Sequence, residues 1–226
     1  MRCVICESDI INSFENYKNY WKCSNCGTVF QQPFDIIDYR DYSKTRSIGR
    51  EKRIQQYKLD LIELNQFVGG GRVLDVGCGD GTFLKLFPSS FLRDGIDLRG
   101  SYRIGDYTTY NFNKEEQFDL IMMRATLEHI STPHEFIQKS HDILAEDGVL
   151  AITHLPNIDN YPKCKSLVKP REHIILYSVK SIQLLLLKHD FDILDIRFSY
   201  FGTPYQYDEG ASFMNVMNVY ARKRCY

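Results

Sequence analysis

The sequence predicts an α/β fold with a mostly parallel sheet, preceded by a small cysteine-rich segment at the N-terminus. From residue 46 onward, short apolar runs alternate with segments of helical periodicity. This alternation is typical of parallel strands joined by helical crossovers. The last two apolar runs have no helical segment between them, so we expect the last strand to pair antiparallel.

The composition is that of an ordinary folded protein. Of the 226 residues, 43% are hydrophobic and 25% are charged, and the net charge is −1. A near-zero charge argues against a strongly basic protein that binds nucleic acid or anionic membranes. The chain does not begin with a basic segment followed by an apolar stretch, and no apolar run approaches the ~18 residues of a membrane helix. We therefore expect a cytoplasmic protein without a membrane span.

Four of the seven cysteines form two C-x-x-C pairs near the N-terminus, namely Cys3, Cys6, Cys23 and Cys26. In a reducing compartment, two such pairs favour one structural zinc ion with four thiolate ligands and no open position for catalysis. Two disulfides or four buried free thiols are the alternatives. We assign residues 1–40 to a zinc ribbon and residues 41–226 to a second domain. The remaining three cysteines are scattered, and we expect them to be ordinary buried or surface thiols: Cys78, Cys164 and Cys225.

The expected elements follow from periodicity and from the positions of glycine and proline. In the first half they are a helix at 46–68, a strand at 72–77, a short helix that ends at Pro88, a strand at 93–98 and a weak strand at 102–104. In the second half they are a strand at 118–123, a helix at 133–144, a strand at 149–153 after a turn at 146–148, a helix at 179–188, and strands at 192–198 and 215–222.

A glycine-rich turn follows the strand at 72–77. Gly77, Gly79 and Gly81 allow a sharp turn and a close approach of a ligand to the backbone. Asp97 ends the next strand, twenty residues after Gly77. A carboxylate at this place accepts hydrogen bonds from ribose hydroxyls, at the edge where parallel sheets bind ligands. The pattern predicts an adenosine-type ligand.

Two cofactors compete for this turn, and a turn without a ligand is the third alternative. A dinucleotide site would need a glycine where Thr82 stands, and Asp75 in the strand would repel its pyrophosphate. Asp75 suits a cationic amino acid group instead. The Asp75–Gly81 stretch thus resembles motif I of the class I S-adenosylmethionine-dependent methyltransferases.

The resemblance extends over roughly residues 40–226. Gly105-Asp106 resembles the position that meets the adenine amino group, and Leu127-Glu128-His129-Ile130 is similar to the stretch after the fourth strand. Two departures are the eight residues between Asp97 and Asp106, too few for the usual helix, and the stretch His189-Asp190-Phe191, where the family usually has a glycine before the Phe. The resemblance implies these cofactor-binding residues: Asp75, Gly77, Cys78, Gly79, Asp97, Leu98, Asp106, Tyr107, Arg124 and His129.

Methyl transfer needs an acceptor held in line with the cofactor and, for some acceptors, a base. His129, His154 and His173 are candidate bases. Glu172-His173 resembles a pair in a zinc-ribbon subgroup that methylates carbon in nucleotide-linked deoxysugars. This implies His173 as general base with Glu172 beside it. A loop histidine that only packs under the last strands is the alternative. The other histidines, on predicted helices, are expected at the surface: His134, His141 and His189.

The same resemblance implies a sugar, glycan or related small metabolite as acceptor, in a polysaccharide-modification pathway, with oxygen or carbon as the methylated atom. Four aromatic residues between the last two strands would stack on a sugar or pack internally: Tyr200, Phe201, Tyr205 and Tyr207.

Two other functions remain open. A nucleic-acid methyltransferase would grip RNA or DNA with the ribbon, but residues 1–40 hold four Lys/Arg against five Asp/Glu. Residues 40–58 hold seven Lys/Arg against two Asp/Glu, a pattern typical of a solvated helix face. A non-catalytic protein that docks a partner through the ribbon would have no need of the glycine turn and Asp97. We therefore do not expect nucleic acid as the partner.

Overall fold

The computed structural model describes residues 1–38, 50–98, 116–161, 164–199 and 215–224. The expected strand at 102–104, the short connection after Asp97, Asp106, Tyr107 and the aromatic residues from Tyr200 to Tyr207 lie outside these residues.

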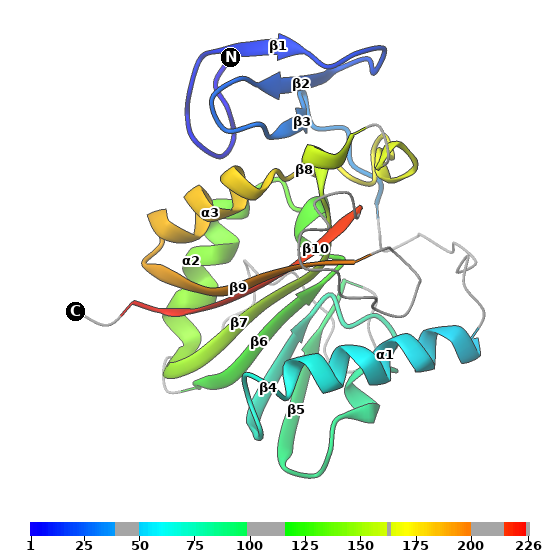
Figure 1. The fold of residues 1–226 in the computed structure, drawn as a ribbon, viewed down its shortest axis with the longest axis vertical. Helices are drawn as coiled ribbons and strands as arrows, with labels where there is room; N and C mark the ends of the chain where they lie inside the picture. The colour runs from blue at the N-terminus through cyan, green and yellow to red at the C-terminus, as the bar shows by residue number, and fades with distance from the viewer. Residues whose placement is uncertain (39–49, 99–115, 162–163, 200–214, 225–226) are drawn as a thin grey trace.

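A six-stranded sheet with the order β5-β4-β6-β7-β10-β9 forms the centre of the molecule (Figure 1). Its strands are β4 (Gly71–Val76), β5 (Phe91–Ile96), β6 (Phe118–Arg124), β7 (Leu144–Pro156), β9 (Phe191–Ser199) and β10 (Val216–Lys223). The first four strands of the order pair in parallel, whereas β10 lies between β7 and β9 and is antiparallel to both. The α/β fold and the antiparallel last strand predicted from the sequence are confirmed.

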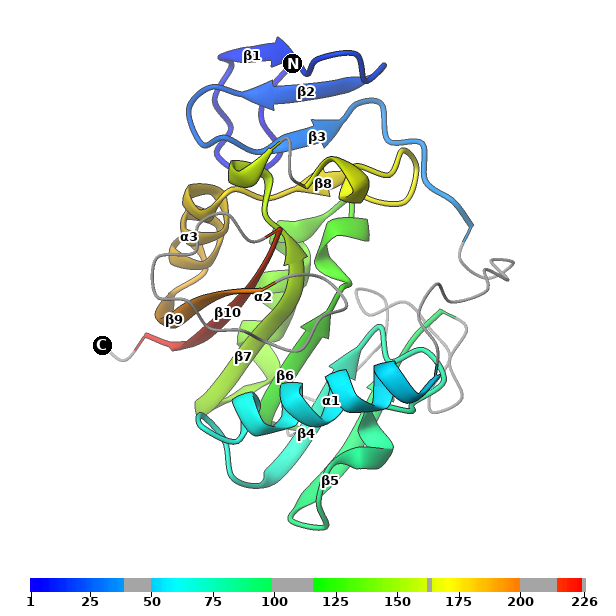
Figure 2. The ribbon, with the colours of Figure 1, turned by 45° about the vertical axis from the view of Figure 1, so that its right-hand side comes forward.

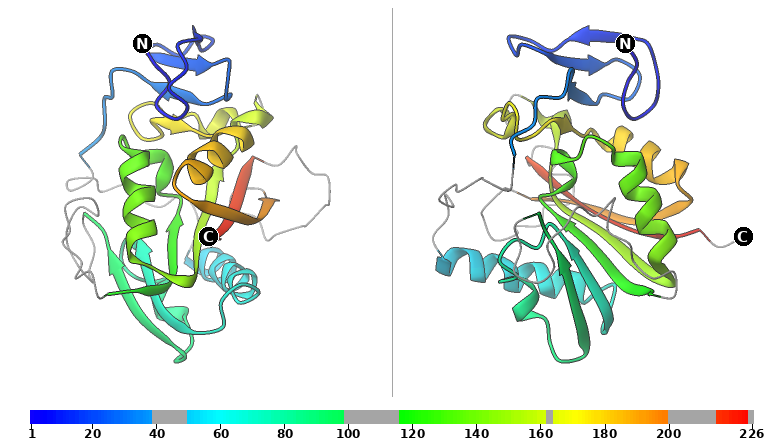
Figure 3. Two further views of the ribbon diagram at one scale, coloured as in Figure 1. Left: turned by 90° about the vertical axis from the view of Figure 1, so that its left-hand side faces the viewer. Right: turned by 180° about the vertical axis from the view of Figure 1, so that it is seen from behind.

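Three α-helices cover the two faces of this sheet, as Figure 3 shows from two sides. Helix α1 (Arg50–Leu64) lies on one face, and α2 (Pro133–Ile143) and α3 (Val179–Lys188) lie on the other. Helix α1 ends at Leu64, four residues before the expected end at 68, and residues 46–49 lie outside the described residues. A 3-10 turn at Leu84–Leu86 replaces the expected short helix, because Gly81 and Pro88 leave too few residues for a longer one.

The strand expected at 149–153 is longer than predicted. It begins at Leu144, and the predicted turn at 146–148 lies within its irregular first part, where the pairing register with β6 shifts between Phe118 and Leu120. Between these two pairs β6 advances by two residues and β7 by five, so three extra residues of β7 bend it locally while the later residues stay in register. The helix expected at 133–144 ends at Ile143, because Leu144 is extended and begins β7.

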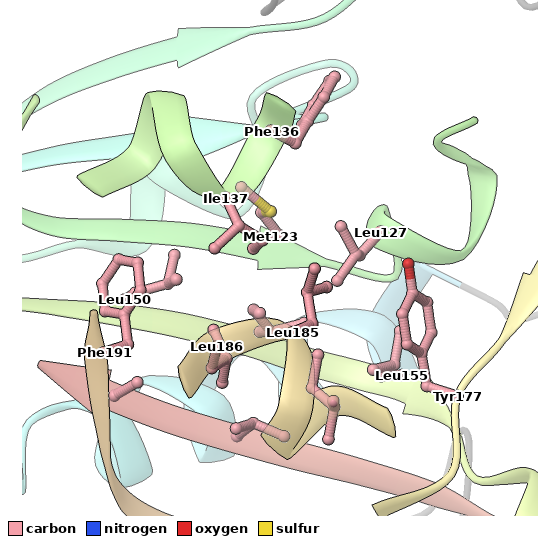
Figure 4. Close-up of a cluster of buried hydrophobic side chains, with 14 of the residues drawn as sticks. Met123, Leu127, Phe136, Ile137, Leu150, Leu155, Tyr177, Leu185, Leu186 and Phe191 are labelled. Carbon is pink, nitrogen blue, oxygen red and sulfur yellow. The ribbon is translucent and has the colours of Figure 1, made fainter. Parts of the chain in front are cut away.

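The two faces of the sheet differ in chemistry. Between the sheet and α2 and α3, most buried side chains are apolar, as Figure 4 shows for Met123, Ile137, Leu150 and Leu185. Each such side chain contributes about 2 kcal/mol by leaving water. On the opposite face, the buried residues of α1 include Asp60, 3% exposed, so polar bonds as well as apolar burial hold this helix.

The N-terminal segment forms a second, four-stranded sheet with the order β1-β2-β3-β8. Three of its strands come from the segment itself, β1 (Ile11–Ser13), β2 (Tyr20–Cys23) and β3 (Val29–Gln31), and β8 (Ile175–Leu176) comes from the later part of the chain. Strands β3 and β8 are antiparallel, with Val29 opposite Leu176 and Phe30 opposite Ile175. Figure 2 shows this sheet above the carboxyl ends of the central strands. No helix in the described part of the chain is long and apolar enough to cross a membrane.

Candidate active site

The glycine turn leaves strand β4 with a backbone that only glycine adopts readily. Gly77 has a φ of 83° and Gly79 a φ of 57°. A Cβ on Gly77 would lie 2.5 Å from Oγ1 of Thr126, so the turn passes directly against the segment that follows β6. The Thr126 hydroxyl also donates to the carbonyl of Val76 over 3.1 Å. The turn and the end of β6 are thereby held together at the carboxyl edge of the sheet.

Asp97 lies at the glycine turn, as predicted. Its Oδ2 accepts a hydrogen bond of 3.0 Å from the backbone N–H of Gly79. This bond joins the end of β5 to the turn after β4. The adjacent Leu98 follows Asp97 after the end of β5 and is 40% exposed.

Asp75 is a buried carboxyl group at the end of β4, with 3% of its surface exposed. Burial raises the pKa of Asp75 to about 7, Arg124 opposes this shift, and Asp97 adds to it. Arg124 donates from Nε to Asp60 over 2.7 Å and lies 4.7 Å from the centre of the Tyr57 ring. The arginine therefore links α1 to the end of β6, next to the predicted cofactor residues.

Cys78, in the middle of the glycine turn, is buried, and burial raises the pKa of its thiol to about 12. A thiol with such a pKa stays protonated at neutral pH and is a poor nucleophile. Its Sγ would lie 2.9 Å from a Cβ on Gly95. Cys78 thus contributes shape and backbone to the turn rather than thiolate chemistry.

Two predicted histidines meet at the same edge of the sheet. The rings of His129 and His173 have centroids 4.9 Å apart and an interplanar angle of 71°. A 3-10 turn at Leu127–His129, directly after Thr126, carries the first, and the segment before β8 carries the second. The structure therefore brings the predicted base close to a residue that the sequence placed at the cofactor.

Backbone carbonyl groups fix the orientation of both rings. Nδ1 of His129 lies 2.6 Å from the carbonyl oxygen of Glu172, and Nδ1 of His173 lies 2.6 Å from that of Leu167. A carbonyl oxygen only accepts, so each Nδ1 carries the hydrogen and each Nε2 of the neutral ring holds a lone pair. Burial lowers the pKa of His129 to about 4, which keeps this ring neutral at pH 7.

Glu128 is a third polar residue at this place and is 1% exposed. Burial raises the pKa of its carboxyl group to about 8. Its Oε1 lies 3.9 Å from Nε2 of His129, and its Oε2 has no hydrogen-bond partner among the described residues. We call Glu128, His129 and His173 the histidine cluster.

The remaining candidates lie elsewhere or act through other atoms. Glu172 orients His129 through its backbone carbonyl, a role that the side-chain pattern did not indicate. His154 is 2% exposed and bonds Asp60 through Nε2 at 3.1 Å, beneath α1. His134 is half-buried rather than at the surface, and its Nδ1 lies 2.9 Å from Nε2 of His189.

Sequence reasoning did not single out Glu128 or the residues that hold the His173 segment. Tyr20 donates to the carbonyl of His173 over 2.8 Å, and the N–H of Gln31 donates to the carbonyl of Ile174 over 2.8 Å. Glu128 was detectable as the acidic neighbour of His129. Tyr20 was not, because 153 residues separate it from His173 and only the folded chain joins them.

The four N-terminal cysteines converge as predicted and form the four-thiol cluster. They are free thiols, and the Sγ atoms of Cys3 and Cys26 lie 3.6 Å apart, as do those of Cys6 and Cys23. A disulfide would need about 2.05 Å, which is far shorter. A tetrahedron with zinc–sulfur bonds of about 2.3 Å has edges of about 3.8 Å, so the donor set fits a zinc ion.

Comparisons with known proteins agree with this geometry. Residues 50–196 match a family model described as a methyltransferase domain. The chain therefore belongs to the methyltransferase-domain family, and this part of it is an S-adenosylmethionine-dependent methyltransferase domain with the Rossmann-like fold.

Individual relatives are more distant. Malonyl-[acyl-carrier protein] O-methyltransferase 1 of Ilyobacter polytropus is 27% identical over 176 residues, which cover 66% of this chain and 64% of that protein. The enzyme of the same name from Calditerrivibrio nitroreducens is 29% identical over 112 residues, 46% of each chain. The chain spans about half the length of the curated relatives it matches.

Solved structures resemble the fold. A Thermotoga maritima protein described as an S-adenosylmethionine-dependent methyltransferase, possibly a histamine N-methyltransferase, has a TM-score of 0.58 and 18% identity. That similarity covers 77% of this chain and 92% of the other. A methyltransferase from Clostridium acetobutylicum has a TM-score of 0.56 and 14% identity and covers 79% and 94% of the two chains.

Proposed function

We propose that the protein transfers a methyl group from S-adenosylmethionine to a sugar, a glycan or a related small metabolite, with His173 as the general base. The observation that carries this proposal is the meeting of His129 and His173 at 4.9 Å, directly after the segment that touches the glycine turn. The cofactor would lie on the turn, with Asp97 at its ribose and Asp75 near its amino acid group. The two rings would then face the methyl group.

The chemistry required of the protein is modest. The sulfonium already carries a good leaving group, so the chain positions the acceptor and takes one proton from it. Nε2 of His173 holds the lone pair for that step, since Nδ1 donates to Leu167. The acceptor oxygen or carbon gains the methyl group, the carbon–sulfur bond breaks, and its electron pair stays on sulfur.

The N-terminal segment contacts the chain next to His173, which favours a role in shaping the acceptor site over a role in binding nucleic acid. Its edge strand β3 pairs with β8, and β8 begins two residues after His173. We propose that a structural zinc ion on the four thiols holds this segment. The sugar-type acceptor rests on the resemblance of Glu172-His173 to the deoxysugar enzymes. The relatives named O-methyltransferases favour oxygen as the methylated atom.

A screen of nucleotide sugars, glycans and malonyl thioesters for methyl transfer, followed by product mass, tests the acceptor class. We expect a mass gain of one methyl group on a sugar. Transfer only to a malonyl thioester would contradict the sugar proposal.

The base is tested by His173→Asn with His141→Asn as the control, because His141 is half-buried on α2, away from the glycine turn. We expect His173→Asn to reduce kcat by about 100-fold or more and leave cofactor affinity unchanged. Normal turnover by this variant would exclude His173 as the base.

A further inference from the structure

The histidine cluster contains three side chains of metal-ligand type around one point. One ligand atom from each of Glu128, His129 and His173 lies within 4.8 Å of the others. The cluster is separate from the four thiols and has a different donor set, with two imidazoles and one carboxylate. Imidazole with carboxylate suits divalent first-row transition ions such as Mn²⁺, Fe²⁺, Co²⁺ and Zn²⁺.

The orientation of the two rings matches that of metal ligands. A ligating histidine usually donates its other ring N–H to a carbonyl or carboxylate, which fixes the tautomer and aims the lone pair at the ion. His129 and His173 both do this, toward the carbonyl oxygens of Glu172 and Leu167, at 2.6 Å each. The two acceptors belong to the same short segment, which also carries His173.

Glu128 supplies an independent observation. Its side chain is 1% exposed, and its Oε2 has no hydrogen-bond partner among the described residues. A carboxylate buried in this way is costly unless a cation or hydrogen bonds compensate it. Lys169 lies close enough to act on Glu128 and His129 electrostatically, but Glu172 acts on His129 in the opposite sense.

From this geometry we propose that Glu128, His129 and His173 bind a divalent first-row transition metal ion that keeps open coordination positions for an acceptor oxygen. Three protein ligands leave such positions, unlike the closed set of four thiols. His129 provides the open side, because its side chain is 21% exposed while that of Glu128 is 1% exposed.

The ion would give the site its acceptor chemistry, and this step rests on the proposed function. An acceptor hydroxyl bound to the ion loses its proton to solvent more readily, because the ion stabilises the alkoxide. The oxygen lone pair then forms the new bond to the methyl carbon, the carbon–sulfur bond breaks, and neutral S-adenosylhomocysteine leaves. With the ion bound, His173 would be its ligand, and the ion would lower the pKa of the acceptor hydroxyl, which replaces proton removal by a free His173.

Metal binding is tested on the full chain with its N-terminal cysteines already loaded with zinc. Co²⁺ is titrated in, and metal content and visible absorption are recorded. We expect a second metal equivalent, with d–d bands and without the thiolate charge-transfer band of a four-cysteine site. Glu128→Gln and His173→Asn should weaken this Co²⁺ binding by about 100-fold or more, with the zinc content unchanged.

Glu135→Gln and His141→Asn are matched controls, because these residues lie on α2 outside the cluster, and we expect no change in them. Thermal melting shows that each variant is folded. Should wild type bind only one metal equivalent, or Glu128→Gln retain the second with full affinity, the inference is overturned.

Activity separates this inference from the proposed function. Methyl transfer to a sugar at an unchanged rate by protein that holds only the cysteine-bound zinc would overturn the metal site and retain His173 as base. A second ion bound through Glu128 in a protein that methylates no sugar would support the metal site and reject the proposed acceptor.

Discussion

The four-thiol cluster and the histidine cluster lie on the two sides of the pairing between β3 and β8. They differ in their donor atoms and in their exposure. The four thiols of the first cluster surround one point, and Cys3, Cys23 and Cys26 are no more than 2% exposed. The second joins a buried carboxylate to the partly exposed ring of His129. Between them, β3 pairs with β8, and Tyr20 donates to the carbonyl of His173.

If the proposed function holds, this difference teaches how the N-terminal segment can shape a reactive site to which it contributes no side chain of the histidine cluster. A closed set of ligands stabilises a fold, whereas an open one leaves room for an acceptor. Here the segment that carries the four thiols pairs with β8, and its Tyr20 and Gln31 donate to the carbonyls of His173 and Ile174. The ribbon is thus part of the site's scaffold.

The largest expected effect comes from breaking the closed cluster. Cys23→Ser should remove zinc, unfold β1–β3 and destabilise the protein by about 3 kcal/mol or more, because metal binding supplies much of the folding energy of so small a unit. Through β8 it should also abolish methyl transfer. Metal analysis, circular dichroism and activity check this. Cys164→Ser, which alters a buried thiol outside the cluster, should retain the zinc. A Cys23→Ser protein with normal stability and no metal in wild type would exclude the zinc assignment.

The next effect concerns the cofactor, at the same edge of the sheet as the histidine cluster. Asp97→Asn should weaken S-adenosylmethionine binding by about 2–3 kcal/mol, through lost hydrogen bonds to the ribose and a weaker bond to Gly79. Calorimetry measures this loss. Asp94→Asn is the matched control, since Asp94 is also on β5 but pairs with Arg72 at 2.8 Å. Equal affinities in wild type and Asp97→Asn would reject the assignment of Asp97.

A smaller effect follows from the pKa of Asp75. Its carboxyl group holds a proton up to about pH 7 in the folded protein, because burial raises its pKa from the ordinary value of 3.8. Its contribution to stability is therefore complete below the unfolded pKa and is lost as pH rises toward the folded pKa. Without cofactor, the free energy of unfolding should fall by up to about 1.4 kcal/mol per pH unit between these values.

Urea unfolding at about pH 5, 6 and 7 measures this slope, and Asp75→Asn should make it shallower by this amount, leaving the contribution of Glu128. Cofactor affinity should change in the opposite direction and rise with pH, because the ionised carboxylate attracts the cationic amino acid group. The same slope in wild type and Asp75→Asn would show that Asp75 does not titrate in this range.

The smallest effect tests the link between the two clusters. Tyr20→Phe leaves the carbonyl of His173 without its donor and should cost about 1 kcal/mol of stability. We expect a several-fold lower kcat with unchanged zinc content and cofactor affinity. Tyr161→Phe, which removes an exposed bond to Glu15, is the control. If both variants have wild-type kcat, the ribbon does not position His173.

Much of this arrangement follows from local sequence. The alternation of strands and helices, the C-x-x-C spacing and the glycine turn with Asp97 each depend on residues close together or at fixed spacing. The pairing of β3 with β8 does not, because nothing in Val29–Gln31 identifies its partner at Ile175–Leu176. For the same reason, the sequence suggested the side chain of Glu172 but not the use of its carbonyl. Glu128 belongs to the stretch Leu127-Glu128-His129-Ile130 that resembles the family. Only its burial in the folded chain makes it a candidate site residue.

The place of β10 in the sheet has a consequence for how the protein is made. β9 leaves the ribosome before β10, yet in the finished sheet β10 lies between β9 and β7. β9 can therefore not pair with its neighbour β10 until β10 has been synthesised. The packing of α3 against β9 in the finished sheet is delayed in the same way. The nascent chain exposes an unpaired edge of β7 until residues 216–223 emerge, the kind of edge to which chaperones and other chains bind.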